Sequence, residues 1–224
     1  MLIGVDLIQV ICEYSKLKTQ VILCNLNKIC RNYIKIYELL GEYRLNDCML
    51  KQSKFDNLKK LNASTSKIKD IGHLIYLEVL LCHGTGCLIS DDDIKNLYKL
   101  KVLNISDNDN IRYIGHLTDL EELDCSRSWI IKGNNLKNLL RLKKLVVHYA
   151  PHIKDINHLY HLKELYCEGN SGISDEDIVN LTNLEILNAF NNNKITQFDR
   201  FINLKQFKSS DSYEWIKTSK FSSI

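Results

Sequence analysis

Residues 100–108 read LKVLNISDN, and the spacing of apolar residues in this stretch organises most of the chain. Leu100 and Leu103 are followed two positions later by Ile105, and Asn108 ends the pattern. The leading pair occurs eight times in steps of 19 to 23 residues: Leu58/Leu61, Leu77/Leu80, Leu100/Leu103, Leu120/Leu123, Leu142/Leu145, Leu162/Leu165, Leu184/Leu187 and Leu204/Phe207. Self-similarity at this period predicts a solenoid in which each copy contributes one structural unit.

This pattern resembles the leucine-rich repeat, L-x-x-L-x-L-x-x-N, over roughly residues 55–210. The resemblance implies short strands that stack in parallel into a curved sheet and turn their leucines inward. We therefore predict an α/β fold, a leucine-rich repeat solenoid of about eight parallel strands, in residues 51–210. A small helical unit is expected in residues 1–50, and a cap or tail in residues 211–224.

Short and long repeats alternate along the chain. Two long repeats contain ISDDDIKNL and ISDEDIVNL, and a third contains a looser version, IIKGNNLKNL, from Ile130. The first two have a serine and an aspartate at capping-box spacing: Ser90 with Asp93, and Ser174 with Asp177. This spacing favours the start of a helix, so we expect a short helix on the convex face of each long repeat. Short repeats carry I-x-x-I-x-x-L and should descend through tighter or extended segments.

A polar residue is expected in the turn after each strand, where its side chain can hydrogen-bond to the backbone. Asparagine occupies this position in three copies, at Asn108, Asn170 and Asn192. Other copies place Ser66, Thr85, Ser128 or Ala150 there. This position is predicted to serve the scaffold.

Residues 6–14, DLIQVICEY, have apolar side chains at helical spacing: Leu7, Ile8, Ile11 and Tyr14. The stretch resembles the opening of an F-box, and Ile29-Cys30-Arg31 resembles a later part of the same motif. That resemblance implies that these four residues dock onto the adaptor subunit of a cullin-type ubiquitin ligase. Alternatively, the helices only cap the first repeat of the solenoid. The loosened motif and the Asn, Ile and Lys bias suit a giant virus or an AT-rich protist.

Composition narrows the classes of function. The net charge is +3 and no basic block stands out, so nucleic acid is not an expected partner. No stretch reaches 18 apolar residues and no secretory signal is recognised, so we expect no membrane association. Cys82, Cys125 and Cys167 share one inward position in alternate repeats, about 10 Å apart, which is too far for a disulfide. Reduced cysteines indicate the cytoplasm or nucleus, of a host cell if the protein is viral.

Acidic and histidine clusters do not have the spacing of a known site. The aspartates near residues 91, 107 and 175 lack the alternation and internal glycine of a calcium loop. His73, His116 and His158 recur in successive short repeats, about 10 Å apart, too far to share a zinc ion. No nucleophile elbow is present. We therefore predict no metal, no cofactor and no enzymatic activity, and we expect a monomer.

Side chains that flank the inward leucines should face outward on the concave surface, because side chains alternate along a strand. They combine charges of both signs with apolar and aromatic residues, a mixture that suits a protein partner. The partner-binding residues predicted on this face are Leu81, His83, Val146, His148, Tyr166, Glu168, Ile186 and Phe190.

These observations favour a non-enzymatic protein-interaction module. The first hypothesis is a substrate-recognition subunit of a cullin-type ubiquitin ligase, with its target on the concave face. The alternative is a stand-alone scaffold or inhibitor that binds a host or cellular protein on the same face. The short repeats also resemble those of bacterial internalins, which implies host-receptor binding, but the expected absence of a secretion signal argues against this third hypothesis.

Overall fold

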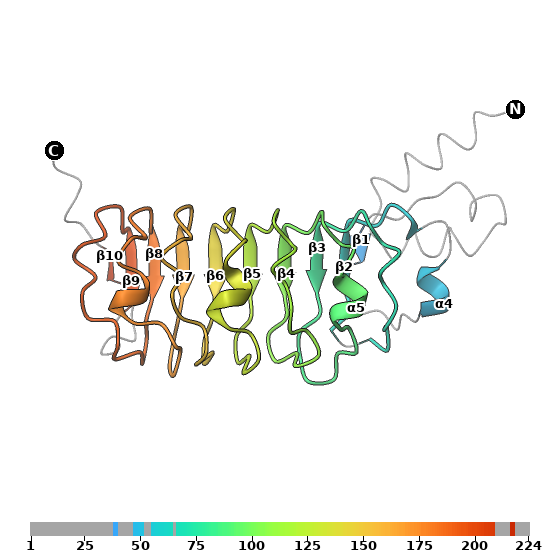
Figure 1. The fold of residues 1–224 in the computed structure, drawn as a ribbon, viewed down its shortest axis with the longest axis horizontal. Helices are drawn as coiled ribbons and strands as arrows, with labels where there is room; N and C mark the ends of the chain where they lie inside the picture. Colours follow the sequence, from blue (N-terminus) through green and yellow to red (C-terminus); the bar gives the residue numbers. More distant parts are fainter. Residues whose placement is uncertain (1–37, 40–46, 52–54, 65, 209–215, 218–224) are drawn as a thin grey trace, which may run out of the picture.

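The computed structural model describes residues 38–39, 47–51, 55–64, 66–208 and 216–217. Within these residues ten strands form one sheet in chain order, and Figure 1 shows them side by side along the length of the molecule. The strands are β1 (Glu38–Leu39), β2 (Lys60–Asn62), β3 (Val79–Leu81), β4 (Val102–Asn104), β5 (Glu122–Asp124), β6 (Lys144–Val146), β7 (Glu164–Tyr166), β8 (Ile186–Asn188), β9 (Gln206–Lys208) and β10 (Ile216–Lys217). The pairs from β1 to β9 are parallel, and β10 is antiparallel to β9. The leucine-rich repeat solenoid predicted from the sequence is confirmed.

The leucine period sets the register of the sheet. The second leucine of each pair lies at the centre of its strand and aligns with its counterpart, as Leu103 does with Leu80 and Leu123. These central side chains are at most 1% exposed. They join the isoleucines and leucines of the return segments in one continuous core. A slip by one residue would turn every leucine outward, so burial of this row strongly specifies the pairing.

The sheet extends beyond the range that the sequence analysis assigns to the repeats. Leu39 of β1 aligns with Leu61 of β2, and Leu39 is buried. The helical turn α4 (Asp47–Leu50) follows, so part of residues 1–50 belongs to the solenoid. At the other end β10 pairs with the last parallel strand. The F-box-like residues Leu7, Ile8, Ile11 and Tyr14 lie outside the described residues.

Each long repeat contains one helical turn in the layer opposite the sheet (Figure 1). These turns are α5 (Asp91–Ile94) and the 3₁₀ turns η2 (Gly133–Leu136) and η3 (Asp175–Asp177). The carboxylate of Asp93 accepts hydrogen bonds from the amide and hydroxyl of Ser90, at 2.9 and 2.8 Å. Asp177 binds Ser174 in the same way. The predicted capping pairs are therefore confirmed.

The third long repeat aligns one residue later than the sequence analysis expects. Ile131, and not Ile130, is the buried counterpart of Ile89 and Ile173. Asn135 then takes the capping place, since its side-chain oxygen accepts a hydrogen bond from the Lys132 amide at 2.9 Å. The looser motif therefore makes the same turn with an amide in place of a carboxylate.

The position after each strand was predicted correctly in five copies and wrongly in two; Ser66, Ser128 and Ala150 are buried there as expected. Asn108 and Asn192 are buried. Thr85 and Asn170 are exposed, whereas Cys87 and Ser171 are buried in their place. In both copies the preceding turn is longer and passes through a glycine with a positive φ, Gly84 at 93° and Gly169 at 63°. The inserted residues shift the buried position along the chain.

Candidate binding surface

We call the face of the sheet away from the helical turns the concave face. The partner-binding residues predicted from the sequence lie across this face or just beyond the ends of its strands. The register places Val146 beside Tyr166 and Tyr166 beside Asn188. Leu81 belongs to the same row across the sheet, but it lies on β3 and aligns with Asn104. Ile186 begins β8. His83, His148, Glu168 and Phe190 each lie two residues beyond the end of their strand. The eight residues therefore divide into a group at β3 and a group at β6–β8.

The β6–β8 group is held together by contacts between neighbouring repeats. The rings of His148 and Tyr166 meet edge to face, with centroids 6.3 Å apart. The Asn188 amide donates a hydrogen bond to Glu168 at 2.6 Å. We call His148, Tyr166, Glu168, Asn188 and Phe190 the aromatic cluster. Lys208 covers one side of it, with its ammonium 4.6 Å from the centre of the Phe190 ring.

His148 is held in its neutral form. The backbone amide of Glu168 donates a hydrogen bond to Nδ1 of His148 at 3.0 Å, so this nitrogen acts as an acceptor. Burial lowers the pKa of His148, and the charge of Glu168 offsets this only in part. The Glu168 carboxylate, 3.8 Å from Nδ1, therefore faces an uncharged ring at neutral pH. The ring offers its remaining N–H and its edge to a partner.

Tyr166 is fixed by residues of its own face. Its hydroxyl donates a hydrogen bond to Glu164 at 3.1 Å. Lys144 lies 3.6 Å from the same carboxylate and 5.4 Å from the centre of the Tyr166 ring. Burial raises the pKa of Tyr166 to about 12, so the hydroxyl stays protonated. A rigid aromatic ring with a polar tip is well suited to contact a protein surface.

Sequence analysis missed the aromatic residues in the turns that follow the strands. Trp129 is 62% exposed and meets His152, with ring centroids 5.9 Å apart. Arg127 forms an ion pair with Asp107 at 3.2 Å and lies 6.0 Å from the centre of the Tyr149 ring. These residues fall outside the strands, so the alternation of side chains along a strand does not predict where they point. In the sequence, the feature that could have identified them is a tryptophan and a tyrosine in otherwise polar turns.

Tyr149 adjoins the aromatic cluster because Gly169 makes room for it. A Cβ atom added at Gly169 would lie 2.2 Å from the Tyr149 ring. The Tyr149 amide also donates a hydrogen bond to the carbonyl of Glu168. The ring is therefore seated against the next repeat, although it remains 45% exposed. Tyr149 and Arg127 extend the cluster toward the end of the strands, and Trp129 lies in the turn after β5.

A hollow of about 210 Å³ lies on the concave face, across strands β3 to β6. It is lined by the predicted residues Leu81 and Val146 together with Val102, Leu103, Asn104, Glu122, Leu123, Asp124 and Lys144. Its floor is the buried leucine row, and its walls combine apolar and acidic side chains. Asn104 on β4 and Asp124 on β5 carry short side chains at the middle of the hollow.

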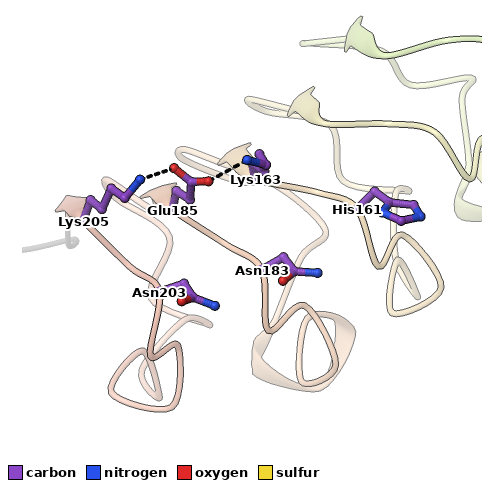
Figure 2. Close-up of a pocket in the computed structure, with 6 residues that line it drawn as sticks. All are labelled: His161, Lys163, Asn183, Glu185, Asn203 and Lys205. Carbon is purple, nitrogen blue, oxygen red and sulfur yellow. Dashed lines mark hydrogen bonds and ion pairs between the residues drawn. The ribbon is translucent and has the colours of Figure 1, made fainter. Parts of the chain in front are cut away.

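A second cavity, of about 390 Å³, lies at the edge where the strands begin. Figure 2 shows its lining residues: His161, Lys163, Asn183, Glu185, Asn203 and Lys205. Glu185 accepts from Lys163 at 2.8 Å and from Lys205 at 2.5 Å, and both lysines lower its pKa to about 2. The amides of Asn183 and Asn203 donate to the carbonyls of Tyr160 and Thr182. Most of its polar groups already serve the scaffold.

The ion pairs of Glu185 with Lys163 and Lys205 belong to a longer series of ion pairs along the edge where the strands begin. Glu78 accepts from Lys59 and Lys101 in the same way, and Glu121 accepts from Lys143. Each pair links one repeat to the next. Exposed ion pairs contribute little individually.

The histidine row has a structural role. The Nε2 atoms of His73, His116 and His158 lie 3.2, 3.1 and 3.1 Å from the carbonyls of Leu50, Ile94 and Leu136. Each of these carbonyls belongs to the last residue of the helical turn in the preceding long repeat. Within the described residues, no group of three or more His, Cys, Asp or Glu side chains could hold a metal ion.

The inward cysteines occupy the core as predicted. Cys82, Cys125 and Cys167 are buried and free. Burial raises the pKa of all three thiols, that of Cys167 to about 12. A buried thiol with a raised pKa is unreactive as a nucleophile. These cysteines therefore pack as small apolar side chains.

The structure is similar to those of solved internalins. An internalin from Listeria monocytogenes has a TM-score of 0.60 and 22% identity, over 92% of this chain and 61% of its own. Internalin C2 from the same organism has a TM-score of 0.54 and 17% identity, over 92% of this chain and 91% of its own. The chain has a leucine-rich repeat fold. It spans about six-tenths of the first of these internalins.

At this level of identity, the similarity shows the fold alone. A scan of protein-family models finds none that matches the chain, and a search of curated proteins finds none that is similar to it. The helices that the structure describes are all too short or too polar to cross a membrane.

Proposed function

We propose that the protein is a non-enzymatic interaction module that binds a protein partner on the concave face, at β6–β8. The observation that carries this proposal is the aromatic cluster with its extension to Tyr149. Tyrosine, tryptophan and arginine dominate the energetics of protein interfaces. Here they gather in neighbouring repeats and are held in place by contacts with their neighbours.

The chemistry elsewhere supports the same proposal. The acidic clusters cap helical turns or accept backbone amides, as Asp91 does from Arg112 and Tyr113. The histidine row contacts backbone carbonyls, and the cysteines are buried. The polar groups of the edge cavity are largely committed to ion pairs and amide contacts. The concave face presents the half-buried rings of His148, Tyr166 and Phe190, and the exposed ring of Tyr149 lies in the turn beside them.

The test is a selection of peptides from a phage-displayed random library against the full chain, followed by affinity measurements on variants. Tyr166→Ala and Tyr149→Ala should each weaken the selected peptides about 30-fold, which corresponds to the roughly 2 kcal/mol of an interface hot spot. Tyr160→Ala is the matched control, since Tyr160 is exposed in a return segment outside the cluster. Peptides that respond to Tyr160→Ala and not to the other two would refute the proposal.

The ligase role is a further proposal, and it is supported by the sequence resemblance of residues 6–14. A substrate-recognition subunit would bind its target through the repeats and the adaptor through Leu7, Ile8, Ile11 and Tyr14. Purified adaptor subunit should bind the full chain, and Leu7→Asp should abolish this binding. A folded full chain that does not bind the adaptor would refute the ligase role and leave the concave-face proposal intact. The ligase role would place the protein in the cytoplasm or nucleus, where free thiols persist.

A further inference from the structure

The hollow at β3–β6 differs from the aromatic cluster in shape and charge. Its apolar walls are Leu81, Val102 and Val146, and two acidic residues of β5, Glu122 and Asp124, line it. The register places Asp124 between Asn104 and Val146, so the acidic side chain is flanked by an amide and a methyl surface. The hollow therefore presents a carboxylate at the base of an apolar wall.

The volume of the hollow limits what can occupy it. Small-molecule sites usually measure about 300–1,000 Å³. At about 210 Å³, the hollow is too small for such a ligand and large enough for one long side chain. Because it opens on the face proposed to bind a protein, its natural occupant is a side chain of that protein.

The charges of the hollow select the type of side chain. Glu122 is exposed and forms no ion pair with any residue that the structure describes. One oxygen of Asp124 accepts from the amide and hydroxyl of Ser126, at 3.0 and 2.7 Å, and the other accepts from Asn104 at 3.3 Å. These contacts fix the carboxylate without neutralising it. A carboxylate has about four lone-pair sites, so Asp124 can still accept from a ligand.

The one cation in the lining is directed elsewhere. Lys144 forms its ion pair with Glu164 on β7, 3.6 Å away, and its ammonium lies near the Tyr166 ring. It therefore compensates the acid of the next strand. The hollow keeps an excess of negative charge from Glu122 and Asp124.

We propose that the hollow receives an arginine or lysine side chain of the protein partner. The aliphatic stem lies against Val102 or Val146, the valines beside Glu122 and Asp124 on the neighbouring strands, because long basic side chains bury their stems along apolar surfaces. The cationic end reaches Glu122 and Asp124, where charge-assisted hydrogen bonds are strongest. This inference rests on the proposed binding at the concave face and specifies the chemistry of the partner.

The test uses the peptides selected against the full chain. Selected peptides should share an arginine or lysine, and its replacement by norleucine should weaken binding to the wild-type chain at least tenfold. Against Glu122→Gln and against the isosteric Asp124→Asn, the same replacement should cost less than threefold. Glu122 is exposed, so Glu122→Gln does not depend on the fold tolerating a change at a half-buried site. Glu176→Gln, on an exposed residue of a helical turn, is the control and should behave as wild type.

The outcomes separate this inference from the proposed function. Selected peptides without a common basic residue would overturn the inference, and so would an equal norleucine penalty on the wild type and both variants. If those peptides still respond to Tyr166→Ala, concave-face binding stands and only the basic anchor fails. If they respond to none of the concave substitutions, both proposals fail.

Discussion

Removing the side-chain amide of Asn108 should destabilise the solenoid strongly. Its amino group donates to the carbonyls of Cys82 and Ile89, at 2.8 and 3.2 Å, and its oxygen accepts from the Asn110 amide at 2.9 Å. Asn108→Ala leaves two buried carbonyls without these donors. Each unsatisfied buried group costs about 1–3 kcal/mol, and alanine avoids the cost of burying an amide. We therefore expect a net loss of about 3 kcal/mol, a large fraction of the 5–15 kcal/mol typical of a folded domain.

Urea denaturation followed by circular dichroism measures this loss as a lower midpoint at an unchanged m-value. Asn192→Ala is an internal replicate, since Asn192 donates to Cys167 and Ile173 at 3.0 Å each. Asn170→Ala is the control, because Asn170 is exposed, and it should stay within about 0.5 kcal/mol of wild type. A loss below about 1 kcal/mol for Asn108→Ala, or an equal loss for the control, would refute the proposed role of this position.

Two further changes test the packing and the edge charges. Gly133→Ala places a Cβ atom 2.0 Å from the Lys154 carbonyl oxygen. This overpacking should lower the free energy of unfolding by about 1–3 kcal/mol in the same denaturation assay. Gly86→Ala places its Cβ atom in open space and should leave the free energy of unfolding unchanged. Equal midpoints for these two variants would contradict the contact at Gly133. The pKa of Glu185 is lowered from 4.5 to about 2, so its contribution to stability is present above pH 4.5 and is lost as the pH falls toward 2. The gap in denaturation midpoint between wild type and Glu185→Gln should therefore shrink from pH 5 to pH 2, and a constant gap would contradict these ion pairs.

The period of the leucines predicted the strands and their parallel register correctly. Burial of one leucine row fixes both the strands and their parallel register, so the concave rows followed from counting alone. The capping pairs were readable because their chemistry requires Ser and Asp at fixed spacing. The distance from the leucine pair did not predict that Cys87 and Ser171 take the buried turn position. In both copies the turn contains extra residues and a glycine, and these leave the spacing of the apolar residues unchanged. The leucine period also missed β1, where a two-residue strand offers too short a pattern.

The candidate surfaces were less predictable, for a physical reason. The hollow depends on how far the side chains of four neighbouring strands project from the sheet. The alternation along each strand predicts which residues face the concave side, but it does not predict how far they project. The place of Tyr149 depends on the absence of a Cβ atom at Gly169, one repeat away. Trp129 lies in a turn, where alternation no longer says which way a side chain points. Contacts between repeats decide all three.

The division between scaffold and function can be argued from recurrence. In a solenoid each repeat contacts only its neighbours, so every structural device has to recur in the copies that need it. The histidine contacts at His73, His116 and His158 recur, and so do the capping acids and the edge lysines. Tyr149 and Tyr166 do not recur: they are aromatic rings at positions where most copies are polar or aliphatic. A side chain that the scaffold does not require in other copies can serve a partner, and Tyr149 and Tyr166 lie in neighbouring repeats, just beyond β6 and on β7.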